Sequence, residues 1–192
     1  MRRKIKINLP FNDLEAIRAL HIGDEVILSG PIITGRDAFH KKLSKMSRAP
    51  DFLTPGSAIY HCGPIAKFAK NKKIELLAAG PTTSWRMGLY APDIIKRFSI
   101  RIFIGKGGMG NIFPETCREY GALYLSFPGG CAQSACKYIT EVVNCHYLKE
   151  FGPAEAVYEI IVKDFPLIVS IDSHGGNIHE SVRMKSLREA GR

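Results

Sequence analysis

The sequence predicts an α/β domain, and three observations lead to that prediction. The chain has 192 residues, of which 45% are apolar and 23% charged, so it can bury a core of ordinary size without metal or disulfide staples. Segments with strand patterns and segments with helix patterns are mixed along its length, which is typical of helices packed on a sheet. The 18 glycines and 11 prolines concentrate where predicted strands end, and α/β proteins place their ligand loops there. We therefore expect a single domain over residues 1–192.

The predicted strands are short apolar or alternating runs bounded by glycine, proline or charged residues. The first strand ends at Pro10, and Gly30-Pro31 is expected to separate two short strands near the N-terminus. Lys163 and Asp164 are expected to separate the last two strands. The predicted strands cover residues 3–9, 25–29, 32–34, 58–61, 74–78, 100–104, 123–127, 157–162 and 167–171.

The predicted helices carry apolar residues at helical spacing. Asn12 or Asp13 is expected to cap the first helix. Gly35 precedes the second, in which Phe39 and Leu43 lie among basic residues. The predicted helices cover residues 14–17, 36–48, 93–98, 111–120, 133–148 and 177–190.

The charge pattern limits the partners that we expect. Lysine and arginine outnumber aspartate and glutamate by 27 to 18, which gives a net charge of +9. The basic residues are scattered, without the stripe of cations and exposed aromatic residues that is typical of nucleic-acid binding. No apolar run approaches the ~20 residues needed to cross a bilayer. The positive field is therefore expected to attract a small anion, and neither nucleic acid nor membrane is expected as a partner.

The five cysteines are expected to be free thiols in a reducing cytoplasm. Their number is odd, no CxxC pair occurs, and the N-terminus lacks the continuous apolar segment of a secretion signal. Cys131, Cys136 and Cys145 fall on a segment predicted as helix, where their spacings turn them through about 140° and 180°. Because they would point apart, an iron-sulfur or zinc site bound by this chain alone is not expected.

The first of three candidate loops contains Gly35-Arg36 at the start of a predicted helix. Free backbone N–H groups beside a guanidinium can grip a carboxylate or a phosphate. The alternative is that Arg36 pairs with Asp37 or with solvent, as many surface arginines do. His40, one turn further on, is equally compatible with the core or the face of the helix.

The second loop, residues 80–87, places three hydroxyl residues before an arginine. Gly80-Pro81 stops the preceding strand, and Thr83 or Ser84 is expected to cap the following helix. Arg86 in the first turn is unfavourable for the helix dipole, so an anion bound there would explain its position. Capping alone is the alternative, but it explains one hydroxyl and neither the other two nor the arginine.

The third loop, residues 105–110, matches G-x-G-x-x-G in letters. A dinucleotide site is not favoured, because the strand predicted at 123–127 has no acidic residue at its end for a ribose. We expect the glycines to let the backbone approach an anion while Lys106 supplies charge, with a purely structural turn as the alternative. A nucleotide-binding oxidoreductase domain and a non-catalytic anion-binding module stay open as functions of another class.

Together, the three loops resemble the β subunit of iron-sulfur hydro-lyases, the class I fumarases and L(+)-tartrate dehydratases. The resemblance rests on segments 28–40, 80–87 and 104–109, in this order and spacing. Asp164-Phe165-Pro166 and Ile171-Asp172-Ser173-His174-Gly175 extend it over nearly the whole chain. It implies the swivelling β/β/α fold of that family.

The resemblance also implies a reaction and a partner. These enzymes reversibly remove water from a 2-hydroxy dicarboxylate, with malate and fumarate as the expected pair and tartrate as the alternative. The family's [4Fe-4S] cluster is held by cysteines of an α part. The resemblance therefore implies an obligate α subunit that carries the cluster, an active site at the junction, and a higher oligomer such as α2β2.

The matched motifs imply roles for five residues. Arg36, Arg86 and Lys106 would bind the substrate carboxylates and stabilise the negative charge that follows proton loss. Thr82 would be the base, which requires strong positive charge nearby because a threonine is a poor base at its ordinary pKa. Thr83 would donate a hydrogen bond to the substrate.

Two further residues match the motif and are expected to lie behind the substrate-binding groups. Asp37 and His40 would orient Arg36 without touching the substrate. The sequence departs from the family's pattern at Phe39, where a small residue is common, and at Gly88, where an aspartate is common. Both departures bear on the choice of substrate.

Overall fold

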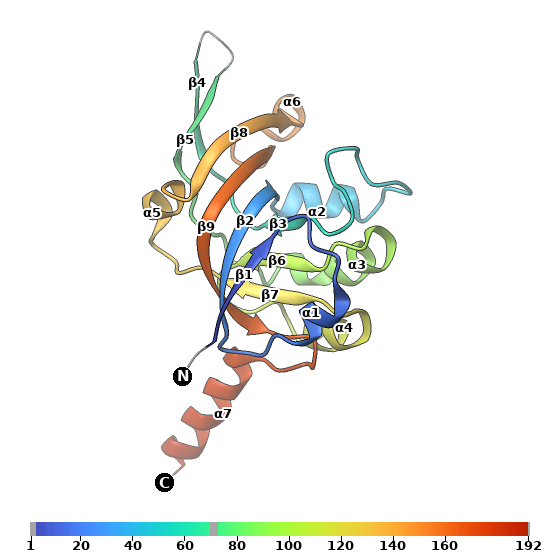
Figure 1. Ribbon diagram of the computed structural model, residues 1–192, viewed down its shortest axis with the longest axis vertical. Coiled ribbons are helices and arrows are strands. Elements are labelled where there is room, and N and C mark those ends of the chain that lie inside the picture. Colours follow the sequence, from blue (N-terminus) through green and yellow to red (C-terminus); the bar gives the residue numbers. More distant parts are fainter. Residues whose placement is uncertain (1–2, 70–72, 192) are drawn as a thin grey trace.

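Figure 1 shows the computed structural model, which describes residues 3–69 and 73–191. Residues 1, 2, 70–72 and 192, which belong to basic segments of the sequence, lie outside the described residues. No helix in the described part of the chain is long and apolar enough to cross a membrane.

The strands form a barrel-like sheet and a separate hairpin. They are β1 (Lys4–Asn8), β2 (Glu25–Thr34), β3 (Ala58–Tyr60), β4 (Ile65–Phe68), β5 (Ile74–Ala78), β6 (Ile102–Gly105), β7 (Leu123–Ser126), β8 (Ile139–His146) and β9 (Val157–Ile171). The main sheet has the order β1-β2-β3-β6-β7-β9-β8, and an additional pairing of β2 with β9 closes five of its strands into a ring. The first five strands of that order run parallel, whereas β9 is antiparallel to its neighbours. The β4–β5 hairpin projects from the barrel (Figure 1).

The helices lie outside the barrel. They are α1 (Leu14–Arg18), α2 (Asp37–Leu43), α3 (Ala91–Phe98), α4 (Phe113–Tyr120), α5 (Ala132–Cys136), α6 (Leu148–Phe151) and α7 (Ile178–Ala190), with a 3-10 turn at Met87–Leu89. Figure 1 shows α2, α3 and α4 on one side of the sheet and α7 extending away from the barrel. The observed architecture is thus mixed α/β, as the alternation of patterns predicts.

The hydrophobic core has two parts because neighbouring strand residues face opposite sides of the sheet. Tyr60 and Ile104 belong to one cluster, which is built mainly from strands. Ile59 and Phe103, each one position earlier, belong to the other cluster, which also contains buried residues of α2, α3 and α4. The strand ends are therefore held on both faces, and this fixes the loops that follow them.

Two predicted strand breaks are wrong. The strands predicted at 25–29 and 32–34 are one strand, β2, with a bulge between Leu28 and Gly30. Those predicted at 157–162 and 167–171 are one strand, β9, in which Asp164 has a φ of 51°. In both places a turn-type residue bends a long strand without ending it, which a closed barrel requires.

The prediction of one helix over residues 133–148 is also wrong, because this segment holds several elements. It consists of α5, β8 and α6, because the β-branched residues between Ile139 and Val143 favour a strand and pair with β9. Cys136 therefore lies in α5 and Cys145 in β8, so the angular argument for their divergence no longer applies. The helix predicted at 36–48 ends at Leu43, and β4 had no counterpart among the predicted strands.

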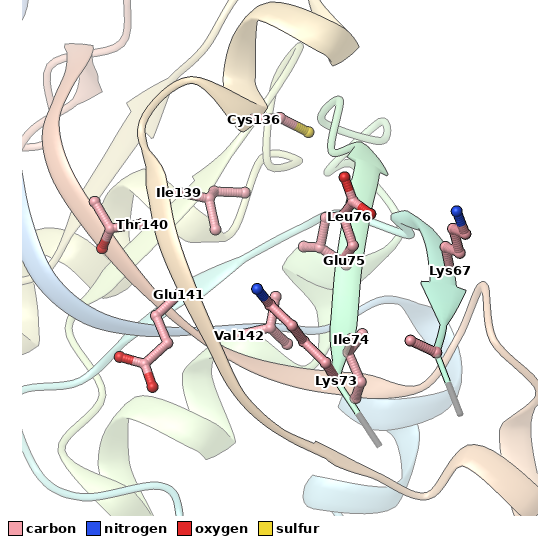
Figure 2. A pocket seen from close by; sticks show the side chains of 11 residues that line it. Lys67, Lys73, Ile74, Glu75, Leu76, Cys136, Ile139, Thr140, Glu141 and Val142 are labelled. Atoms are coloured by element: carbon pink, nitrogen blue, oxygen red, sulfur yellow. The ribbon is translucent and has the colours of Figure 1, made fainter. Parts of the chain in front are cut away.

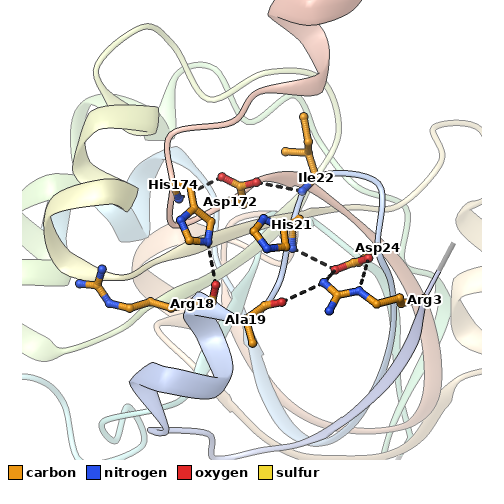
Figure 3. Close-up of polar contacts among 8 residues, drawn as sticks. All are labelled: Arg3, Arg18, Ala19, His21, Ile22, Asp24, Asp172 and His174. Carbon is orange, nitrogen blue, oxygen red and sulfur yellow. Dashed lines mark hydrogen bonds and ion pairs between the residues drawn. The ribbon is translucent and has the colours of Figure 1, made fainter.

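A polar cluster ties the end of β9 to the start of β2 (Figure 3). The carboxylate of Asp172 accepts hydrogen bonds from the backbone N–H groups of Ile22, His174 and Gly176, at 2.9, 3.0 and 2.8 Å. The rings of His21 and His174 stack with their centroids 4.6 Å apart. This cluster fixes the turn that leads into α7.

Candidate functional site

The structure brings the three candidate loops together. β2, β3 and β6 are neighbouring parallel strands, and Arg36 and Lys106 follow the carboxyl ends of the first and the third. The second loop joins them, because the N–H of Thr82 donates to the carbonyl of His61 just after β3, at 2.7 Å. The N–H of Ser84 donates to the carbonyl of Lys106 at 3.1 Å. Loops that lie far apart in the sequence thus share one edge of the barrel.

Arg36 is held by a carboxylate that the sequence did not indicate. Its Nε lies 3.2 Å from Oε1 of Glu155, and its Nη1 donates to the carbonyl of Ala154 at 3.3 Å. The second oxygen of Glu155 accepts from the N–H of Ala38 in the first turn of α2, at 3.1 Å. The sequence predicts that a guanidinium and backbone N–H groups bind an anion here. In the structure they contact the carboxylate of Glu155.

Gly63 provides the space for the Arg36 side chain. A Cβ at this position would lie 2.5 Å from Nη1 of Arg36 and 2.4 Å from the carbonyl oxygen of Ala154. Both distances are shorter than van der Waals contact, so only glycine lets the guanidinium lie against this backbone. His61-Cys62-Gly63-Pro64, at the exit of β3, is the sequence signal that could have identified this part of the site.

Asp37 pairs with Arg86 and not with the guanidinium of Arg36. Two parallel hydrogen bonds join the side chains, from Nε to Oδ1 at 2.7 Å and from Nη2 to Oδ2 at 2.8 Å. The Arg86 guanidinium holds the pKa of Asp37 below its ordinary value. The expectation that Asp37 orients Arg36 is therefore corrected, because Asp37 orients Arg86 and Glu155 contacts Arg36.

The remaining candidates lie beside these pairs. Arg86 begins a 3-10 turn and not the α-helix that the sequence predicts. Thr82 is half-buried and Thr83 exposed, and Thr83 forms a β-bridge with Lys106. The side chain of Lys106 runs along Gly129, where a Cβ would lie 3.3 Å from its Cδ. All five residues implied as substrate-binding thus belong to adjoining loops.

A buried polar network lies under the loops. His40 places Nδ1 2.9 Å from the carbonyl oxygen of Arg36. His61 places Nδ1 2.8 Å from Oγ of Ser84, and Tyr124 donates its hydroxyl proton to the same oxygen at 2.9 Å. Burial lowers the pKa of His40 to about 4 and that of His61 well below its ordinary value, so both imidazoles are neutral near pH 7. From the sequence, Ser84 is expected only as a cap, and neither His61 nor Tyr124 is predicted as part of the site.

Two surface grooves lie apart from the substrate-binding candidates. One, of about 750 Å³, runs between the β4–β5 hairpin and β8, where Leu76 and Val142 line it (Figure 2). The other, of about 580 Å³, lies between Trp85, the third loop and the start of α7. Arg36, Arg86 and Lys106 line neither groove.

The described residues do not fit an iron-sulfur cluster. Within residues 3–69 and 73–191, no group of three or more histidine, cysteine, aspartate or glutamate residues is arranged to hold a metal ion. Burial also raises the pKa of the Cys62 and Cys117 thiols, which disfavours the thiolate that metal binding requires.

Comparison with known proteins gives the family. The model of the Fumarase C-terminus family matches residues 1–182. A protein provisionally named fumarate hydratase class I from Geobacillus stearothermophilus is 44% identical over 188 residues, which are 98% of this chain and 36% of that protein. The L(+)-tartrate dehydratase subunit beta of Escherichia coli (strain K12) is 37% identical over 179 residues, which are 93% of this chain and 87% of that subunit. The chain therefore spans about a third of the first relative and most of the second, and it belongs to the Fumarase C-terminus family.

Proposed function

We propose that this chain is the β subunit of an iron-sulfur hydro-lyase that interconverts malate and fumarate in the cytoplasm, as part of the tricarboxylic acid cycle. The observation that carries the proposal is the meeting of Arg36, Thr82, Arg86 and Lys106 on three adjoining loops at one barrel edge. The names of the two relatives, a fumarate hydratase and a tartrate dehydratase subunit, support a hydro-lyase. In this proposal residues 1–192 form one domain of the swivelling β/β/α type.

The geometry supports carboxylate binding by the arginines. Arg86 holds the carboxylate of Asp37 through two parallel hydrogen bonds, and Arg36 pairs with Glu155. Bidentate pairing, as between Arg86 and Asp37, is the strongest way in which a guanidinium binds a carboxylate. A dicarboxylate substrate would compete for these groups or bind beside them, with Lys106 adding a third positive charge.

Thr82 is proposed to remove the proton from the carbon next to the one that loses the hydroxyl. Loss of this proton and departure of the hydroxyl as water together give the double bond of the product. The positive charges of Arg36, Arg86 and Lys106 would stabilise both the developing negative charge on the substrate and a deprotonated Thr82. Thr83, exposed beside Lys106, would donate a hydrogen bond to the substrate.

The site is proposed to be completed by an α subunit that carries the [4Fe-4S] cluster, in an assembly such as α2β2. The chain spans only 36% of the fumarate hydratase relative, and the second relative is named as a beta subunit. Large apolar side chains also lie exposed on or next to the second and third loops: Trp85 is 56%, Leu89 72% and Ile112 59% exposed. Such side chains around a polar site are typical of a surface that a partner covers.

The test is reconstitution. The chain would be produced alone and together with an α-type subunit of the same source, under anaerobic conditions, and both preparations would be assayed with malate, fumarate and tartrate. We expect no turnover by the chain alone and turnover of malate and fumarate by the complex. Robust activity without a partner would contradict the split site.

A tartrate dehydratase β subunit is the second candidate. It is favoured by the Escherichia coli relative, which this chain matches over 87% of that subunit's length. The same assay separates the two candidates, because preference for tartrate over malate would select it. A nucleotide-binding module would instead be indicated by NAD raising the melting temperature of the chain alone.

A further inference from the structure

Four buried polar side chains lie directly beneath the loops of the proposed site. His40, His61, Ser84 and Tyr124 each have 0% of their surface exposed. The rings of His40 and His61 meet edge to face, with centroids 4.8 Å apart. Buried polar groups are costly unless they hydrogen-bond, so a buried cluster of these four side chains needs a reason.

The hydrogen bonds give the cluster a direction. A carbonyl oxygen only accepts, so His40 donates from Nδ1 to the carbonyl of Arg36, and its Nε2 carries a lone pair when the ring is neutral. Ser84 accepts from Tyr124, and its own proton can be donated to Nδ1 of His61, which lies 2.8 Å from Oγ. His61 then carries its proton on Nε2, which is the complement of the bare Nε2 of His40. Neither Nε2 has a hydrogen-bond partner among the described residues.

His61 and Ser84 are tied by their main chains to the second and third loops. His61 accepts from the N–H of Thr82 at 2.7 Å and donates to the carbonyl of Ile104 at 2.7 Å. Ser84 donates from its N–H to the carbonyl of Lys106 at 3.1 Å. The hydrogen bond between the side chains of His61 and Ser84 therefore adds a further link between these loops.

The cluster occupies the space that a side chain at Gly105 would need. A Cβ at Gly105 would lie 1.9 Å from Oγ of Ser84, 3.0 Å from the hydroxyl of Tyr124 and 3.2 Å from Nδ1 of His61. The absence of a side chain on β6 at this position is what admits the cluster. Gly105 is the residue immediately before Lys106.

We propose that His61, together with His40, Ser84 and Tyr124, is a positioning network that fixes Thr82 relative to Arg36 and Lys106. None of the four side chains touches the substrate in this proposal. They act through the main chains of the residues that do, and a displacement of about 1 Å in such a group can cost roughly 100-fold in rate. As an account of catalysis the proposal rests on the proposed function, whereas the network itself does not.

The kinetic test uses the complex with its α subunit. Tyr124→Phe and Ser84→Ala remove hydroxyls from the network, and Ser57→Ala is the matched control, because Ser57 is a buried serine bonded to Thr54 just before the start of β3. We expect the first two to lower kcat by about 10- to 100-fold with KM changed less than about threefold, and the control to keep both constants. If Tyr124→Phe and Ser84→Ala keep kcat within twofold of the wild type, or lower it no more than Ser57→Ala does, the positioning role is wrong.

A second measurement does not depend on activity. Nitrogen-15 NMR of the imidazole rings in the chain alone reports which nitrogen carries the proton. We expect His40 to be a neutral Nδ1–H tautomer and His61 a neutral Nε2–H tautomer at pH 7, and we expect Ser84→Ala to shift the resonances of His61. Exchanging tautomers in both rings of the wild type would overturn the network. An inactive complex with fixed tautomers would refute the proposed function and leave the network in place.

Discussion

Two pairs of histidines in contact show how differently the same residue type is used in this protein. His40 and His61 meet edge to face beneath the candidate loops, fully buried, with centroids 4.8 Å apart. His21 and His174 stack at 4.6 Å on the surface, where Nε2 of His174 donates to the carbonyl of Arg18 at 2.7 Å (Figure 3). The buried pair joins the loops of the proposed site, and the exposed pair joins the start of β2 to the end of β9.

The two pairs differ in burial. The buried imidazoles are kept neutral by desolvation, and each has one hydrogen-bonded Nδ1. His21 and His174 are exposed, so solvent can replace the hydrogen bond that the His174 ring makes to the carbonyl of Arg18. Changes around the buried pair should therefore alter the free energy of unfolding and the proposed activity together, whereas changes around the exposed pair should alter stability alone.

The largest effect is expected from a methyl group placed in the buried network. In Gly105→Ala the new Cβ would overlap Oγ of Ser84, so the hydroxyls must move and lose their partners. We expect the free energy of unfolding to fall by about 4 kcal/mol, the sum of overpacking and unsatisfied polar groups. Urea unfolding of the chain measures it. The control is Gly108→Ala in the same loop, where the nearest atom is 3.7 Å away; an equal loss in both variants would contradict the account.

A second effect concerns pH. The folded pKa of His40 is about 4, below the ordinary 6.5, so the unfolded chain binds a proton that the folded chain does not as pH falls below about 6.5. The stabilisation is complete above pH 6.5 and is lost as pH falls toward 4. From pH 7 to 5 we expect a loss of about 2 kcal/mol from His40 alone. Asp24 and Asp37 have lowered pKa values and stay ionised over this range.

Urea unfolding at several pH values tests this prediction. The control is His179→Gln, which removes an exposed histidine of α7 and should leave the pH dependence unchanged. An unfolding free energy that is the same at pH 7 and pH 5 would show that the buried histidines are not held neutral.

A smaller effect is expected at the exposed pair. In Asp172→Asn an amide NH₂ replaces one oxygen that accepts from backbone N–H groups, so two donors face each other. We expect a loss of about 1 kcal/mol in unfolding free energy and unchanged kcat and KM of the complex. A change in kcat larger than in stability would place this cluster in the site.

The smallest effect is expected from His174→Gln. The side chain is exposed, and the amide of glutamine can still donate to the carbonyl of Arg18. We expect the free energy of unfolding to stay within about 0.5 kcal/mol of the wild type. A larger loss would mean that the stack with His21 is worth more than an exposed ring contact.

The parts of the proposed site differ in how far the sequence predicts them. The candidate loops were predicted because glycine, hydroxyl and cationic residues stand next to one another in the chain. Glu155 and Tyr124 were not predicted, because each meets its partner across long sequence separations that depend on closure of the barrel. That closure rests on the pairing of β2 with β9, whose Gly30-Pro31 and Asp164 indicate strand ends locally and act as bends in the sheet. β8 was missed because its apolar residues and Cys145 also suit a helix.

In the proposed function this chain supplies the base of a hydro-lyase site, and the kcat of Thr82 variants in the complex shows whether it does. Thr82→Ala should lower kcat for malate by at least about 100-fold while KM changes less than about threefold, because the hydroxyl acts in proton removal and not in ground-state binding. Thr82→Ser, which keeps a hydroxyl at the same position, should retain kcat within about tenfold of the wild type, since only a methyl group is lost. Near-normal turnover by Thr82→Ala would contradict the claim.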